Sequence, residues 1–474
     1  MIFRKTKNTH VRFERYGGFV YILNGTNQSK TKITDENEAF LFWLAVNGKP
    51  QSLNDKIQEW IAKGYLEAVG PVLLREANKN LFFERSREDK FHPKPKIVLD
   101  KLEQYSSSVG LNIAIDERMF FEKEFIGKPA DYTATPLLAT LGITSLCNFK
   151  CRYCGNDSGR RGKEELSLKE IFGLLRELGN LQILKLTLTG GEPLLKERFF
   201  EILRFAAERI PRVTVTSNGS LIDKKISQRL KKEGVSALKI SIDGTEDFHD
   251  KNRGYKGAYQ KALQAIRYLT AEGIEVRVQS TLMRENTGSI VELMPVLSGL
   301  GARVHSIVPV SPIGRARPQR LRRSVGGQAS GDLMLSPKEY KDYVLGVNRA
   351  AKEINSKTVF EIRPVFGLDF KNNLEVLSTK YKCEALKTTF EITPTGKVVP
   401  CSFFPMEMGD IRISGLQDIW VSDRAHQIRR VFDDKLLEGK CRDCQIRKEC
   451  GGGCPANSYA IYKKHHLGDV YCWK

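Results

Sequence analysis

The spacing of apolar residues divides the chain into parts with different expected folds. Between residues 137 and 330, short apolar runs alternate with stretches whose apolar positions recur every three to four residues. Six strand-and-helix units in succession predict an α/β fold with a parallel sheet. The predicted strands are 137–144, 183–189, 212–217, 236–242, 274–281 and 303–310, and the predicted helices between them include Leu168–Leu178 and Ala258–Ala271.

Residues 1–95 have a different pattern and predict a small separate domain. Strand-like runs around Gly17-Gly18 are followed by helical patterns at 34–47 and 54–63, and a closing hairpin is predicted over 72–83. Strands, helices and a hairpin in this order predict a winged-helix-like domain. Such a domain either binds DNA, binds a peptide or serves as a structural cap.

The second of these predicted helices argues against DNA. It carries Lys56 and Lys63, but Asp55 and Glu59 cancel their charge, which leaves a poor phosphate-binding face. We therefore do not expect nucleic acid as a partner.

Two connectors separate the remaining parts. Residues 96–136 predict a charged linker after the first domain, and residues 331–382 predict a bridging segment after the sheet. The last part, residues 383–474, is rich in cysteine. We read no chemistry in the linker.

Hydropathy and cysteine content indicate the compartment. No apolar run is long enough to span a membrane, and the basic stretch Met1–His10 lacks the apolar region of a signal peptide. Both features predict a cytoplasmic protein without a membrane partner. Ten cysteines in such a protein indicate metal or redox chemistry rather than disulfides.

The charge balance is strongly basic. Lys and Arg number 76 against 56 Asp and Glu, a formal net charge of +20, which favours acidic peptides, nucleic acid or phosphorylated substrates. One basic run lies after the sixth predicted strand and is either a solvated loop or a site for an acidic peptide or phosphate. It consists of Arg315, Arg317, Arg320, Arg322 and Arg323.

Three cysteines follow the first predicted strand of the sheet. Cys147, Cys151 and Cys154 have C-x3-C-x2-C spacing. A 4Fe–4S cluster takes four thiolates, so three in one loop would leave one iron open to another ligand. A zinc or disulfide site is the alternative, but zinc sites favour C-x2-C pairs and four ligands.

This triplet resembles the cluster loop of the radical S-adenosylmethionine (SAM) enzymes. The resemblance implies a partial (βα)6 barrel, similar to a TIM barrel, whose active groups lie at the carboxyl ends of the strands. It also implies that the open iron chelates the amine and carboxylate of SAM, and that Tyr153 packs near the adenine.

Four further segments extend the resemblance and imply SAM contacts. They are Gly190-Gly191-Glu192-Pro193 for the amino group, Ser217 and Asn218 for the ribose, and Ser241 with Arg253 for the carboxylate. Without the resemblance, the glycines read as an ordinary βα turn and Ser217-Asn218 as a helix cap. Asp243 and His249 read equally well as loop-stabilising or as functional residues.

The seven remaining cysteines match the motif of a SPASM domain, which carries two auxiliary 4Fe–4S clusters. The resemblance implies that Cys441, Cys444, Cys450 and Cys472 bind the distal cluster. It implies that Cys383, Cys401 and Cys454 bind the nearer one, which has no cysteine in Leu377–Lys382 to supply a fourth thiolate. We therefore predict an open iron there, or a ligand other than cysteine. A two-zinc site is the alternative.

The resemblance implies a radical enzyme with three 4Fe–4S clusters and SAM. Reductive cleavage of SAM would give a 5′-deoxyadenosyl radical that takes hydrogen from a substrate C–H bond. The N-terminal domain is similar to the precursor-recognition module of peptide-modifying members, which binds a leader peptide as an added strand. Our leading hypothesis is a maturase that forms a thioether or carbon–carbon crosslink in a ribosomally made precursor peptide. Flavodoxin or ferredoxin would supply electrons.

Two other functions stay open. One is a SPASM oxidase or maturase that acts on a protein side chain or on a haem or quinone cofactor precursor without a leader. Sulfatase maturation is disfavoured within that class, because Ser402 stands where those enzymes place an Asp. The other is an iron–sulfur DNA-binding sensor, which would not need the complete set of SAM-binding segments.

Overall fold

The computed structural model describes most of the chain after residue 134. The described residues are 135–162, 164–317, 333–354, 357–364, 366, 383–404 and 406–474, together with residue 132 and five short strands before residue 70. The chain divides into two compact units, Met1–Ala134 and Thr135–Lys474. Each unit is described by itself.

The described part of the first unit consists of antiparallel strands. β2 (Thr9–Arg12), β3 (Val20–Asn24) and β4 (Lys30–Ile33) form one sheet, and β1 (Ile2–Lys5) pairs with β5 (Leu66–Val69). β2 and β3 flank Gly17-Gly18, where the sequence predicted two strands. The predicted helices and closing hairpin of the winged-helix-like domain lie outside the described residues.

The second unit is built on one curved sheet of ten strands. Its order is β12-β11-β10-β9-β8-β7-β6-β13-β14-β15, and all neighbours from β12 to β13 are parallel. This confirms the predicted α/β fold with a parallel sheet. The strands are β6 (Leu138–Gly142), β7 (Lys185–Thr189), β8 (Arg212–Ser217), β9 (Ala237–Ser241), β10 (Glu275–Leu282), β11 (Val304–Pro309), β12 (Val359–Ile362), β13 (Thr389–Ile392), β14 (Lys397–Val399) and β15 (Gly409–Asp410).

Two parallel strands were not predicted. The six predicted strands are β6 to β11, whereas β12 comes from the bridging segment and β13 from the cysteine-rich region. β13 pairs with β6, and β14 and β15 then extend the sheet antiparallel. The cysteine-rich region is therefore hydrogen-bonded directly to β6, the strand that precedes the cysteine triplet.

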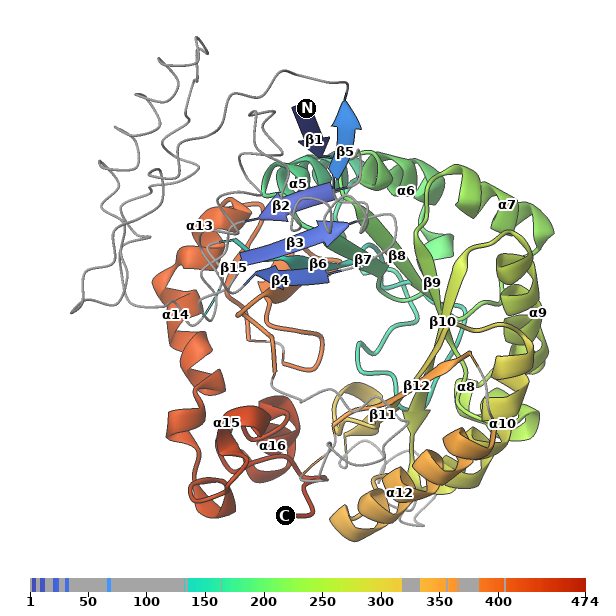
Figure 1. The fold of residues 1–474 in the computed structure, drawn as a ribbon, viewed down its shortest axis with the longest axis vertical. Helices are drawn as coiled ribbons and strands as arrows, with labels where there is room; N and C mark the ends of the chain where they lie inside the picture. The colour runs from blue at the N-terminus through green and yellow to red at the C-terminus, as the bar shows by residue number, and fades with distance from the viewer. Residues whose placement is uncertain are drawn as a thin grey trace. The chain divides into compact units, whose positions relative to one another are not determined.

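Amphipathic helices cover the convex side of the sheet (Figure 1). α5 illustrates why they form: Ser167 and Glu170 make a capping box, and Ile171, Leu174 and Leu178 give it a buried face. The helices are α5 (Leu168–Asn180), α6 (Phe199–Ala207), α7 (Lys224–Lys232), α8 (Glu246–Arg253), α9 (Ala258–Ala271), α10 (Thr287–Gly299), α12 (Pro337–Ile354), α13 (Leu416–Val421), α14 (Asp423–Arg429), α15 (Arg447–Cys450) and α16 (Pro455–Tyr462).

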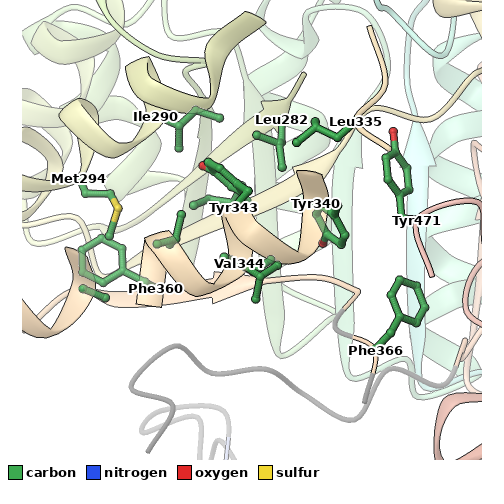
Figure 2. Close-up of a cluster of buried hydrophobic side chains, with 14 of the residues drawn as sticks. Leu282, Ile290, Met294, Leu335, Tyr340, Tyr343, Val344, Phe360, Phe366 and Tyr471 are labelled. Carbon is green, nitrogen blue, oxygen red and sulfur yellow. The ribbon is translucent and has the colours of Figure 1, made fainter. Parts of the chain in front are cut away.

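A hydrophobic cluster joins the C-terminal end of the chain to one edge of the sheet. Figure 2 shows Tyr340 and Tyr343 of α12 in this cluster, together with Phe360 of β12 and Tyr471. The Tyr340 hydroxyl donates to the Pro364 carbonyl at 2.7 Å, and the Tyr471 hydroxyl donates to the Val310 carbonyl at 2.6 Å. These two hydroxyls are thus satisfied, whereas the buried Tyr343 hydroxyl has no hydrogen-bond partner among the described residues. The residue next to Tyr471, Cys472, is fixed relative to the sheet.

Among the described residues, no helix has the length and apolar character needed to cross a membrane.

Candidate active site

The cysteine triplet lies in a loop directly after β6. Its backbone is tied to the end of α8, because Lys150 N donates to Arg253 O and Arg152 N donates to Asn252 O, both at 3.1 Å. Burial raises the pKa of the Cys147 thiol to about 11, and burial also raises that of Cys151. A thiol must lose its proton to bind iron. Because the pKa of each of these thiols is raised, the thiolate form needs a positively charged partner to stabilise it.

Arg315, which follows β11, holds the same loop in place through hydrogen bonds. Its Nε donates to the Cys151 carbonyl and its Nη1 to the Ser158 carbonyl, both at 2.7 Å, and its backbone N donates to Cys154 O at 3.0 Å. Gly314 makes this approach possible, since a Cβ there would lie 2.3 Å from Cys154 O. The sequence placed Arg315 in a solvated or substrate-binding basic run and missed this contact.

Asp243 is the hydrogen-bonding centre beneath the loop. Its fully buried carboxylate accepts from Arg253 Nε at 2.8 Å and Nη2 at 3.0 Å, and from the Tyr153 hydroxyl at 2.8 Å. Asn252 Nδ2 and the Thr281 backbone N complete its shell. Despite its burial, the pKa of Asp243 is lowered by the Arg253 charge. The structure thus gives Asp243 a loop-stabilising role.

His249 has the same kind of role. Its Nδ1 accepts from the Asp243 backbone N at 3.0 Å, and burial lowers its pKa to about 4. The ring is therefore neutral near pH 7, as its acceptor role requires.

Arg253 and Tyr153 are consequently engaged before any ligand binds. Two nitrogens of the Arg253 guanidinium contact Asp243, and the third, Nη1, lies 3.7 Å from Cys151 Sγ. The expected contacts of Arg253 with the SAM carboxylate and of Tyr153 with adenine stay predictions.

The glycines of the segment 190–193 let β7 pack against the start of the cysteine loop. A Cβ at Gly190 would lie 2.2 Å from Thr144 O, and one at Gly191 would lie 2.1 Å from Leu146 O. Glu192 N donates to Leu146 O at 2.8 Å and continues this pairing. The glycines are therefore required by a protein contact, whether or not a ligand also lies here.

Glu192 connects this segment to the end of β8. Its carboxylate accepts from Ser217 Oγ at 2.9 Å and from Asn218 N at 2.8 Å, and Asn218 Nδ2 reaches Asn148 in the cysteine loop. Burial raises the pKa of Glu192 to about 7. The structure thus brings Glu192, Ser217 and Asn218 together beside the loop, while Ser241 lies at the carboxyl end of β9. Their contacts with SAM remain predictions.

The four cysteines expected at the distal cluster line one pocket. Cys441, Cys444, Cys450 and Cys472 line a small cavity of about 20 Å³. A Cβ at Gly468 would lie 2.5 Å from Cys441 Sγ, so glycine keeps room beside this thiol. The set of four thiol donors fits a four-thiolate cluster.

The three cysteines expected at the nearer cluster also converge. Burial raises the pKa of Cys454 well above 9, and the negative charges of Asp469, Cys383 and Cys401 raise it further. Burial raises the pKa of Cys401 to about 12, with a contribution from Cys383. Three mutually interacting thiols fit a cluster with one position free of cysteine, and that open position stays a prediction.

In the described part of the chain, no three His, Cys, Asp or Glu side chains converge closely enough to hold a single metal ion.

A pocket of about 300 Å³ lies between the triplet loop and the nearer cluster cysteines. Gly155 and Asn156 from the loop line one side, and Cys401 and Phe403 line the other. Arg317, from the basic run, also lines it, while Arg320, Arg322 and Arg323 lie outside the described residues.

One buried carboxylate faces this pocket. Glu391 of β13 lines it and accepts from Ser402 N at 2.9 Å and Ser402 Oγ at 2.6 Å. Burial raises its pKa. The sequence reading considered Ser402 but missed Glu391, because β13 itself was not predicted.

Comparisons with known proteins agree with this arrangement. Residues 141–294 match the Radical SAM superfamily, and residues 383–445 match the iron–sulfur cluster-binding domain SPASM. The AdoMet-dependent heme synthase of Methanosarcina barkeri is 28% identical over 354 residues, 72% of this chain and 97% of that protein. The subtilosin biosynthesis protein AlbA of Bacillus subtilis is 26% identical over 352 residues, 71% of each chain.

Among solved structures, Streptococcus suis SuiB bound to S-adenosylmethionine has a TM-score of 0.66. At 20% identity, the match covers 99% of this chain and 100% of SuiB. Such a likeness establishes the fold, a radical SAM partial barrel followed by a SPASM region. SAM and iron–sulfur clusters are typical of these domains, and the number of clusters in this chain stays a prediction.

Proposed function

This chain carries the radical SAM and SPASM domains of a radical SAM/SPASM enzyme, and from that premise we propose that it modifies a ribosomally made precursor peptide. The modification is a thioether or carbon–carbon crosslink. One pocket is lined both by Gly155 and Asn156, directly after the triplet, and by Cys401, which supports a substrate held near both sets of cysteines.

A structural match that extends over the first unit is the observation that favours a peptide substrate. SuiB, which one solved structure holds bound to its precursor peptide SuiA, covers 100% of this chain with a TM-score of 0.66. The first unit, Met1–Ala134, accounts for a little over a quarter of the chain. We assign leader-peptide binding to this unit.

The residues of the second unit then have distinct tasks. Cys147, Cys151 and Cys154 would hold a cluster with an open iron, and the seven later cysteines would hold two auxiliary clusters. With SAM and an electron carrier such as flavodoxin or ferredoxin, the first cluster would supply one-electron chemistry at a substrate C–H bond. Asp243, Arg253 and Arg315 keep the loop in place, and the pocket walls orient the substrate and exclude water.

Anaerobic turnover tests the proposal. The reconstituted enzyme receives SAM, a reductant and the precursor peptide encoded beside its gene, and mass spectrometry follows 5′-deoxyadenosine and the peptide. We expect loss of two mass units per crosslink, only with an intact leader. Deoxyadenosine formed with no mass change in the peptide would contradict it.

A second candidate is oxidation of a haem precursor, because the AdoMet-dependent heme synthase of Methanosarcina barkeri is 28% identical to this chain. That function needs no leader peptide. The same assay with a haem-precursor porphyrin in place of the peptide decides between the two, since the true substrate alone will be consumed in step with SAM.

A further inference from the structure

The concave face of the sheet carries a cluster of five cations, four of them in the first or middle part of β7 to β10 and the fifth directly after the carboxyl end of β12. Alternation along each strand places the cations on the face opposite the buried Val213, Val215, Leu238 and Ile240. The register puts Lys185 of β7 beside Arg212 of β8, and Lys239 of β9 beside Arg277 of β10. Arg363, just after β12, completes the set. We refer to these five residues as the barrel-floor cations.

Two carboxylates neutralise only part of this charge. Glu275 pairs with Arg212 at 3.0 Å and with Arg277 at 3.4 Å. Glu361 pairs with Arg277 at 3.4 Å and with Arg363 at 3.1 Å. Five cations against two carboxylates leave three positive charges in excess.

Both lysines lack a partner among the described residues. Neither Lys185 nor Lys239 makes a hydrogen bond or an ion pair there, although each stands next to an arginine. Burial and the charges of Lys239, Arg212 and Arg277 lower the pKa of Lys185 to about 8, and burial lowers that of Lys239 as well. Near pH 7 Lys185 still carries its proton, so the repulsion persists.

Unsatisfied donors on the same face provide a second, independent observation. Within the part of the chain that the structure describes, Arg212 Nη1 and Arg363 Nε are buried without a hydrogen-bond partner, and so is Thr214 Oγ1, on a side chain that is only 1% exposed. Thr214 lies two residues after Arg212 and points to the same side of β8. Buried donors without acceptors are costly, and such donors around excess positive charge form a receptor for an anion.

We propose that the barrel-floor cations bind one anionic group, a carboxylate or a phosphate. Lys239 lies two residues before Ser241 on β9, so the site lies roughly 6–7 Å deeper than the strand ends that face SAM. It is therefore a separate site beneath the SAM site. The side chains are partly exposed, Arg277 at 25% and Arg363 at 40%, so an anion can reach them.

Calorimetry on the full-length, cluster-loaded protein without SAM tests this site. The probes are inorganic phosphate and glutarate, and the variants are Lys239→Met and Lys185→Met. The matched control is Lys232→Met, which removes the same charge from an exposed position on α7. We expect the wild type and the control to bind equally, and each floor variant to bind about tenfold more weakly or worse.

Thermal unfolding without anion shows that the variants fold, because removal of a repelled ammonium leaves the melting temperature unchanged or raises it. Tighter binding of glutarate identifies a carboxylate carried by the substrate, and tighter binding of phosphate identifies a phosphate ligand. No binding of either probe to the wild type, or equal binding by the floor variants, overturns the proposal. Since no turnover is involved, this outcome is independent of the peptide-maturase proposal.

Discussion

The two cysteine-bearing regions of the molecule are held in place in different ways. The triplet loop is fixed by two side chains distant in sequence, Arg315 and Asp243, and by a backbone hydrogen bond from Glu192. The distal cysteine region is shaped by its own backbone, with local turns at Cys441 and Cys450 and glycines at positive φ. The shape of the triplet loop therefore depends on single polar side chains. The shape of the distal cysteine region depends on glycines at positions where a larger side chain cannot fit.

Replacement of Asp243 tests this difference most strongly. In Asp243→Asn, the buried Arg253 guanidinium loses its counter-charge, and we expect the free energy of unfolding to fall by about 3–5 kcal/mol. SAM cleavage is lost as well, because the triplet loop loses its support. Urea denaturation and 5′-deoxyadenosine formation measure both effects. Asp247→Asn, at an exposed position of α8, is the control, and equal behaviour of the two variants would contradict the prediction.

Acid should weaken the triplet region through His249. Its pKa is about 4 in the folded protein and about 6.5 when unfolded, so the unfolded chain binds the extra proton first. The stability that this group contributes is present above pH 6.5 and is lost as pH falls through 4, by up to about 3 kcal/mol. In His249→Asn this loss disappears from the pH profile of unfolding. The exposed His426 provides the control, and an unchanged profile in His249→Asn would show that other groups cause the acid loss.

Removal of Arg315 should loosen the triplet loop alone. Arg315→Met leaves the Cys151 and Ser158 carbonyls without their donor, and we expect a loss of about 2 kcal/mol. Chelators should then strip iron from the first cluster before the auxiliary clusters, which absorption and iron analysis can follow. Arg303→Met changes an exposed arginine and should retain iron as the wild type does. Uniform iron loss from all sites in Arg315→Met would remove the distinction between the regions.

A glycine replacement is the matching test of the distal region. In Gly468→Ala, the new Cβ would lie 2.5 Å from Cys441 Sγ, and iron content should fall by about a third, one cluster of the three proposed. Gly439→Ala is the control, because it also has positive φ but its Cβ would have 3.8 Å of clearance. Both variants pay a backbone cost of about 1 kcal/mol, so stability alone should not separate them. Full iron content in Gly468→Ala would show that the distal cysteine region can accommodate a side chain at this position.

The sequence predicted the regular part of the fold and the chemical character of the site. β6 to β11 were foreseen because each is an apolar run followed by an amphipathic helix. β12 and β13 were missed because each has only four residues and a glutamate, Glu361 or Glu391, at its third position. Those glutamates face the polar concave surface of the sheet, and the pattern of apolar residues within four positions does not show this.

Contacts between distant segments could not be predicted. Gly314-Arg315 was noticed, but only the folded sheet brings it to the carbonyls of the triplet loop. For Asp243 the sequence left two roles open, and five donors around its carboxylate identify the stabilising one. Spacing within a motif identifies ligands, whereas the side chains that hold the motif come from elsewhere in the chain.

The pairing of β13 with β6 fixes two cysteine-bearing segments relative to each other. About 250 residues of chain separate these strands, yet they are adjacent in the sheet, with Thr140 opposite Glu391. The triplet loop follows β6, and Cys401 follows β14, which pairs antiparallel with β13. Insertions in the intervening helices and loops can therefore change the walls of the pocket without altering this pairing.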